Sequence, residues 1–114
     1  MTPTARTLHE CRQRGWLADV TERWIGKAPF AKRKDLFGFI DVLAIDTQSN
    51  QLVGIQCTSG SNAAARITKI LTECEQAAQL LSACNVRLEV WAWKKYATKI
   101  NRRSWRVRIE AVEV

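Results

Sequence analysis

Two apolar runs joined by a short polar segment constrain the fold of this chain more than any other feature. Residues 37–45 and 52–58 are rich in Ile, Val, Leu and Phe, which favour β-strands. The segment DTQSNQ between them is typical of a short hairpin loop. The two runs are therefore predicted to be antiparallel neighbours in one sheet.

Two polar residues, Asp41 and Gln56, interrupt these apolar runs. If Asp46 pairs with Gln51 across the turn, counting back along both strands places Asp41 directly opposite Gln56. Side chains alternate between the two faces of a strand, so Thr58 lies on the same face as Gln56. This register predicts one patch that contains Asp41, Gln56 and Thr58, and a shift by one residue would separate them.

The predicted patch has the chemistry of a divalent-metal site. Magnesium takes oxygen ligands, keeps several of its waters and often binds only one or two carboxylates of a protein. The predicted ligands are the Asp41 carboxylate, the Gln56 amide oxygen and the main-chain carbonyl of Cys57. The alternative is that Asp41 and Gln56 only form a hydrogen bond to each other at a sheet edge.

The remaining pattern predicts helices that cover a mixed sheet of about five strands, an α/β fold in a single domain over residues 1–114. A first helix is expected from Pro3 to Gly15. A long amphipathic helix is expected from Ala63 to about Cys84, because apolar residues recur there at spacings of three and four. Further strands are predicted at residues 16–24, 86–93 and 104–114, and a basic loop at 25–35.

The net charge of +7 points to a polyanionic partner, and nucleic acid is the commonest one. A basic surface without a partner is the alternative. The segment WAWKKYATKINRRSW interleaves basic and aromatic residues, a pattern that can bind phosphates and stack on bases. Trp91 and Trp93 are nevertheless expected to pack in the core and not to stack on bases. The candidate phosphate-binding residues are Lys34, Arg66, Lys94, Lys95, Lys99, Arg102 and Arg103.

The sequence also indicates the compartment. No apolar run approaches the roughly 20 residues that a membrane helix needs, and the N-terminus lacks the apolar core of a secretory signal. The four cysteines form no CxxC pair and are expected to be reduced. A cytoplasmic protein that does not enter a membrane is therefore expected.

The segment GFIDVLAID, the polar turn and then LVGIQCTS resemble the core of the PD-(D/E)XK nuclease superfamily, especially archaeal Holliday-junction resolvases and related phage enzymes. The resemblance covers about Thr7 to Lys95 and implies a restriction-endonuclease-like core. By this resemblance Asp41 matches the metal-binding aspartate. Gln56 stands at the position of a glutamate, and Thr58 at the position of a lysine.

The resemblance also implies an accessory glutamate in the first helix, which Glu10 matches, with Glu22 as a less favoured substitute. Asp35 is a further candidate carboxylate, although a loop cap is the favoured role for it. The missing lysine is known to move to the following helix in this superfamily, where Lys69 is the candidate. The alternative is that Lys69 and Arg66 lie on a solvated face, with an ion pair to Glu73.

The function implied by the resemblance is Mg²⁺- or Mn²⁺-dependent hydrolysis of phosphodiester bonds in branched or otherwise structured DNA, by a homodimer. The replacement of glutamate by Gln56 and of lysine by Thr58 favours a second hypothesis. In that hypothesis the protein keeps the nuclease fold and binds nucleic acid without cutting it. A basic protein-interaction module is the third hypothesis.

Overall fold

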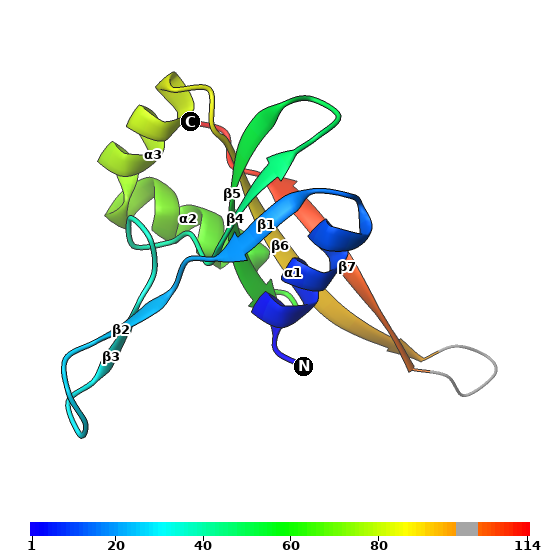
Figure 1. Ribbon diagram of the computed structural model, residues 1–114, viewed down its shortest axis with the longest axis horizontal. Coiled ribbons are helices and arrows are strands. Elements are labelled where there is room, and N and C mark those ends of the chain that lie inside the picture. Colours follow the sequence, from blue (N-terminus) through cyan, green and yellow to red (C-terminus); the bar gives the residue numbers. More distant parts are fainter. Residues whose placement is uncertain (98–102) are drawn as a thin grey trace.

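The structure is a computed structural model that describes residues 1–97 and 103–114 (Figure 1). Three helices and seven strands make up this described part of the chain. The helices are α1 (Pro3–Gln13), α2 (Ala63–Glu73) and α3 (Glu75–Ala83); the strands are β1 (Leu17–Val20), β2 (Arg23–Ile25), β3 (Lys32–Lys34), β4 (Val42–Asp46), β5 (Gln51–Ser59), β6 (Arg87–Ala97) and β7 (Arg103–Ala111).

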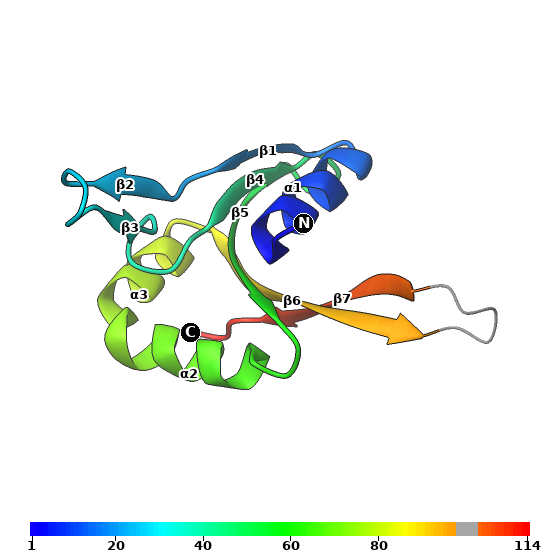
Figure 2. The ribbon, with the colours of Figure 1, turned by 90° about the horizontal axis from the view of Figure 1, so that it is seen from below.

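One five-stranded sheet in the order β1-β4-β5-β6-β7 forms the centre of the molecule. The pair β5–β6 is parallel and the other neighbours are antiparallel. Helix α1 lies on one face of this sheet, and α2 and α3 lie on the other (Figure 2). The predicted α/β fold with a mixed sheet of about five strands is confirmed. None of the helices in the described residues is both long enough and apolar enough to cross a membrane.

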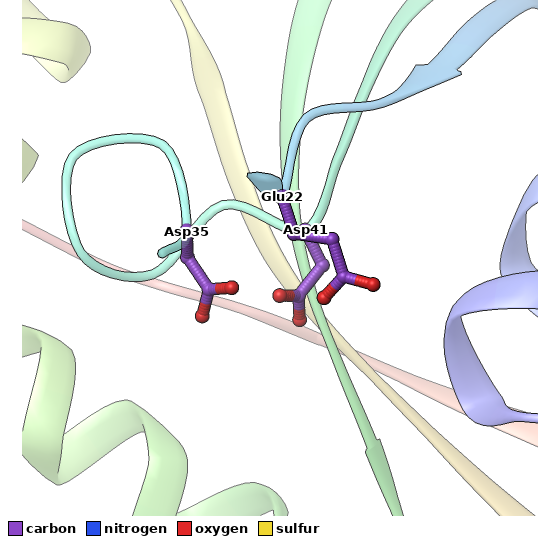
Figure 3. Close-up of side chains that lie close together, drawn as sticks. All are labelled: Glu22, Asp35 and Asp41. Carbon is purple, nitrogen blue, oxygen red and sulfur yellow. The ribbon is translucent and has the colours of Figure 1, made fainter. Parts of the chain in front are cut away.

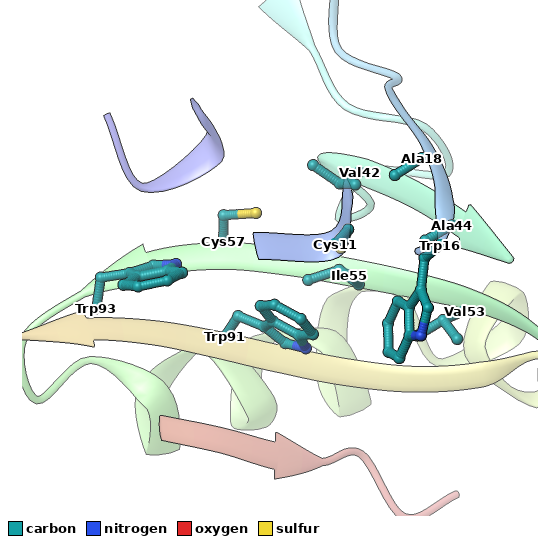
Figure 4. Packing of buried hydrophobic residues seen from close by; sticks show 10 residues of the cluster. All are labelled: Cys11, Trp16, Ala18, Val42, Ala44, Val53, Ile55, Cys57, Trp91 and Trp93. Atoms are coloured by element: carbon teal, nitrogen blue, oxygen red, sulfur yellow. The ribbon is translucent and has the colours of Figure 1, made fainter. Parts of the chain in front are cut away.

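The face of the sheet beneath α1 is built around tryptophan side chains (Figure 4). Trp16, Trp91 and Trp93 are all buried there, and the rings of Trp16 and Trp91 meet edge to face with their centroids 6.0 Å apart. The Trp93 indole N–H donates to the hydroxyl of Thr7 in α1 at 2.9 Å, so helix and sheet are also joined by a buried hydrogen bond. Trp91 and Trp93 are core residues, as expected, and are not available to stack on bases.

The hairpin of β4 and β5 has the predicted register. Asp46 pairs with Gln51 and Leu43 pairs with Gly54. The regular strand begins at Val42 and not at Phe37, so the predicted strand over 37–45 is too long. Phe37 and Gly38 both adopt positive φ angles, of 54° and 85°, which form a turn just before the strand.

A two-stranded sheet of β2 and β3 replaces the predicted basic loop and the end of the predicted strand over 16–24. The chain leaves the main sheet after Val20, and Arg23–Ile25 pairs with Lys32–Lys34. Every residue of these two short strands is exposed. The alternation of buried and exposed residues that identifies a strand is therefore absent from this hairpin, which is why the pattern did not reveal it.

The predicted long helix is wrong, because Cys74 separates α2 from α3. Cys74 has φ −121° and ψ 25°, which interrupts the helical backbone. Its sulfur packs close to Gly38, where an added Cβ would lie 3.3 Å away. Both helices turn apolar residues toward the same face of the sheet. The spacing of apolar residues therefore continues across the break and does not reveal it.

Candidate metal centre

Three carboxylates meet where β1 ends and β4 begins. One oxygen from each of Glu22, Asp35 and Asp41 lies within 4.8 Å of an oxygen from each of the other two (Figure 3). They border a pocket of about 450 Å³ that also opens onto the start of α1, the end of β5 and the first turn of α2. Glu22 and Asp35 are half-buried and Asp41 is buried, so the cluster is reached from solvent through the first two.

Glu22 and Asp35 meet because they flank the β2–β3 hairpin. Arg23 pairs with Lys34 at the base of the hairpin, so the next opposite positions are those of Glu22 and Asp35. The neighbouring Thr21 ties this base to Asp41, since its main-chain N–H donates to the Asp41 carbonyl at 2.9 Å. The hairpin therefore contributes two of the three carboxylates to the cluster.

Asp41 immediately precedes β4 and is fixed by two donors. Its Oδ2 accepts a hydrogen bond from Gln56 Nε2 at 2.7 Å and another from the main-chain N–H of Cys57 at 2.8 Å. Burial raises the pKa of Asp41 from 3.8 to about 7. The Cys57 N–H opposes this rise in pKa, and the neighbouring Asp35 and Glu22 carboxyl groups increase it.

The electrostatics of this cluster favour a bound cation. Two like charges about 4 Å apart near a protein surface repel each other by about 4 kcal/mol, and the triad brings three such groups together. A divalent ion removes that repulsion, and carboxylate oxygens are the ligands that Mg²⁺ and Mn²⁺ prefer. Glu22, Asp35 and Asp41 could therefore hold a metal ion.

Gln56 and Cys57 lie beside Asp41, as predicted, and Asp41 and Gln56 form the hydrogen bond that the sequence left open as an alternative. Both donate hydrogen bonds to the carboxylate, so they orient Asp41. The Cys57 side chain belongs to the core beneath α1. Burial raises the pKa of its thiol to about 12, which keeps the thiol protonated. Glu22 and Asp35 are the carboxylates that join Asp41 in the cluster of possible ligands, in the pocket that Gln56 and Cys57 also line.

Thr58 and Arg66 line the pocket, as their candidate roles require, and Glu10 and Lys69 do not. Glu10 forms an ion pair with Arg14 of the same helix, at 2.9 Å. Lys69 approaches Glu73 at 4.0 Å on an exposed side of α2, which is the alternative that the sequence left open.

Arg33 is not among the site residues predicted from the sequence, and Glu22 and Asp35 are predicted only in minor roles. Arg33 lines the pocket and lies 3.5 Å from Glu22. The register of the β2–β3 hairpin would have shown that Glu22 and Asp35 face each other. That register is hard to find, because both strands are only three residues long and fully exposed.

The remaining basic candidates are dispersed over the molecule. Lys34 is exposed in β3, next to Asp35. Lys94 and Lys95 are exposed in β6. Arg103 begins β7, where its backbone pairs with Ala97. The candidates Lys99 and Arg102 lie outside the described residues.

Comparison with known proteins adds no family to this description. No protein-family model, no curated protein and no solved structure matches the chain. The function is therefore inferred from the geometry and the charge of the pocket.

Proposed function

We propose that the protein is a metal-dependent nuclease of the PD-(D/E)XK type that hydrolyses phosphodiester bonds in DNA. The observation that carries the proposal is the convergence of Glu22, Asp35 and Asp41 at an open pocket that arginines also line. Carboxylates that hold a divalent ion next to cations that hold phosphate are the parts that phosphodiester hydrolysis requires.

Asp41, Glu22 and Asp35 would hold Mg²⁺ or Mn²⁺. The ion would supply Lewis-acid activation of the phosphate and of the attacking water. Gln56 and the Cys57 N–H keep the Asp41 carboxylate in one orientation, because both donate to its Oδ2.

The cationic side of the pocket fits the substrate phosphate. Arg33 and Arg66 line it together with Asn62, the residue that precedes α2. The Asn62 side chain makes no capping hydrogen bond, and the N-terminus of a helix attracts anions. Arg66 lines the pocket and Lys69 does not, so Arg66 is better placed to offset negative charge that develops on the phosphate. Thr58 can donate a hydrogen bond, but it does not supply the charge of a lysine.

The order of elements also supports the PD-(D/E)XK type. Helix α1 precedes β1, β4 and β5, which are antiparallel neighbours in the main sheet. Helices α2 and α3 then lead to β6, which is parallel to β5. Asp41 lies beside Gln56, as the superfamily pattern implies. The homodimer implied by the same resemblance stays a prediction, which the molecular mass in solution would test.

Cleavage of linear, nicked and four-way DNA with Mg²⁺ or Mn²⁺ tests the proposal. We expect metal-dependent cleavage that Asp41→Asn reduces at least a hundredfold while DNA binding is retained, since several kcal/mol of stabilisation are lost with the ion. Asp19→Asn is the matched control, because Asp19 is an exposed aspartate in β1. Cleavage that persists in EDTA, or that is equal in the two variants, would contradict the proposal.

Binding of nucleic acid without cleavage is the second candidate function. It is favoured by Thr58 at the position of the lysine and by the contact of Lys69 with Glu73 outside the pocket. Salt-dependent DNA binding with no cleavage under either metal would support this function in place of the nuclease. The absence of binding to DNA or RNA at low salt would favour the third hypothesis, a protein-interaction module.

A further inference from the structure

Strands β6 and β7 extend beyond the rest of the main sheet. The last pair between β5 and β6 is Ser59 with Trp93, whereas β6 and β7 continue to pair as far as Ala97 with Arg103. Residues 94–97 and 103–106 therefore form a two-stranded ribbon, which projects from the body of the protein (Figure 2). We call this ribbon the arm.

The two faces of the arm differ in what they contact. On the face toward α1, the guanidinium of Arg6 lies 3.9 Å from the centre of the Trp105 ring, and the Lys95 ammonium lies 5.8 Å from it. On the opposite face, Lys94, Tyr96 and Arg106 line a groove of about 280 Å³ together with Arg108 and the turn before α2. Since side chains alternate along a strand, Lys94 and Lys95 belong to different faces although they are neighbours in sequence.

The cations in the groove are held around one aromatic ring. Lys94 Nζ lies 5.7 Å and the Arg106 guanidinium 5.2 Å from the centre of the Tyr96 ring. Arg108 pairs with Glu110, but neither Lys94 nor Arg106 has a carboxylate partner among the described residues. At least two positive charges therefore face the groove, and no carboxylate in the described part of the chain pairs with them.

The groove and the carboxylate pocket lie on either side of one turn. Ser59 and Asn62 line the pocket of Glu22, Asp35 and Asp41, and Gly60 and Ser61 line the groove. The turn is tied to β6 at the base of the arm, because the Gly60 N–H donates to the Trp93 carbonyl at 2.8 Å. The pocket and the groove are therefore neighbours across this turn.

We propose that the groove of Lys94, Tyr96, Arg106 and Arg108 binds the phosphate backbone of a nucleic acid a few nucleotides away from the phosphate in the carboxylate pocket. The position relative to a phosphate in the carboxylate pocket rests on the proposed function, whereas the binding of nucleic acid by the groove does not. A chain of phosphates fits the site because it is an extended polyanion and the groove is an extended set of cations. Tyr96 acts as a positioning residue, since its ring is covered by the two cations.

Anisotropy of a labelled DNA duplex tests the proposal, with the Asp41→Asn protein in EDTA so that no cleavage occurs. We expect Lys94→Gln and Arg106→Gln each to weaken binding about three- to tenfold and to reduce the slope of log K against log salt by about 0.9. Lys95→Gln is the matched control, with the same loss of charge one residue away on the other face. Its effect is expected to be less than half as large.

Two further arms of the experiment make the assignment specific. Tyr96→Leu is expected to weaken binding while Tyr96→Phe preserves it, because the phenyl ring keeps the contact with both cations. A single-stranded oligonucleotide should show the same order of variants with a smaller slope, about 0.7 for each contact. Equal thermal unfolding of the variants would show that the fold is unchanged.

Three outcomes would overturn the proposal. The first is wild-type affinity in both Lys94→Gln and Arg106→Gln, and the second is an equal loss in Lys95→Gln. The third is binding to anionic phosphatidylserine vesicles, lost in Lys94→Gln, without any binding to nucleic acid. The first two outcomes leave metal-dependent cleavage untouched, so the groove proposal can fail while the nuclease proposal stands. The third outcome would count against both proposals.

Discussion

The two aspartates at the ends of β4 are both buried, but their surroundings are opposite in charge. Asp46 accepts a hydrogen bond from Arg87 Nη2 at 2.9 Å and one from the Gln48 N–H at 3.0 Å, and the arginine holds its pKa below the usual value. Asp41 has other carboxyl groups as neighbours, and its pKa is raised to about 7. Burial alone therefore does not define the role of a carboxylate. The neighbouring charges distinguish an aspartate that stabilises the fold from one that is suited to hold a cation.

The response to metal should separate the two aspartates most strongly. At pH 8 and about one hundred times the dissociation constant, Mn²⁺ should raise the melting temperature of the wild-type protein by about 10 °C. Asp46→Asn should keep this increase and Asp41→Asn should lose it. The increase should be smaller at pH 6, because carboxyl groups must lose their protons to bind the ion. Thermal unfolding with and without Mn²⁺ checks this, and an equal increase in both variants would refute the metal site.

Asp46→Asn should have the next largest effect, a fall of several degrees in the melting temperature at pH 7. The variant weakens the contacts with Arg87 and with the turn. Since the pKa of Asp46 is lowered in the folded state, its contribution is present above the unfolded pKa and is lost as pH falls through the folded pKa. The difference from wild type should therefore shrink in acid. A difference that grows in acid would contradict this assignment.

In the absence of metal, Asp41→Asn should raise the melting temperature, whereas Asp46→Asn should lower it. Between about pH 4 and pH 7 the unfolded chain loses the Asp41 proton while the folded protein retains it, so the wild type loses stability as pH rises. The variant should therefore melt a few degrees higher than wild type at pH 8, and at the same temperature near pH 4. Melting curves in EDTA across this range measure the effect. A variant that is less stable at pH 8 would show that the carboxylate is structural.

Gln56→Leu should have the smallest effect of these variants, a change in the pKa of Asp41. It removes one of two donors to Asp41 Oδ2 and leaves the Cys57 N–H in place. The pKa of Asp41 should rise further, because a hydrogen bond to the charged form is lost. An NMR titration of the Asp41 carboxyl carbon measures this change, and a lower pKa would show that Gln56 does not stabilise the charged form.

The sequence predicts some elements of this fold in detail and others not at all. The β4–β5 hairpin could be placed to the residue, because apolar strands on both sides of a polar turn permit few registers. The break at Cys74 could not, since α2 and α3 pack on one face and share one apolar periodicity. Strand β3 is a run of three basic residues, and its pairing leaves no apolar pattern to detect.

The candidate site was predictable to the same extent. Asp41 and its neighbour Gln56 follow from the hairpin register, and the structure places them 2.7 Å apart. Glu22 and Asp35 come from the hairpin that the pattern did not reveal, so their convergence on Asp41 was not foreseen. Carboxylates supplied by short exposed segments are the part of such a site that only the three-dimensional structure brings together.

The position of Glu22 and Asp35 at the base of the β2–β3 hairpin has a consequence for how this protein can vary. Residues 26–31 at the far end of that hairpin do not line the carboxylate pocket, and Phe30 there is 82% exposed. Insertions at such a loop tip have little thermodynamic cost. The tip can therefore be lengthened or exchanged while the paired base keeps both acids in place.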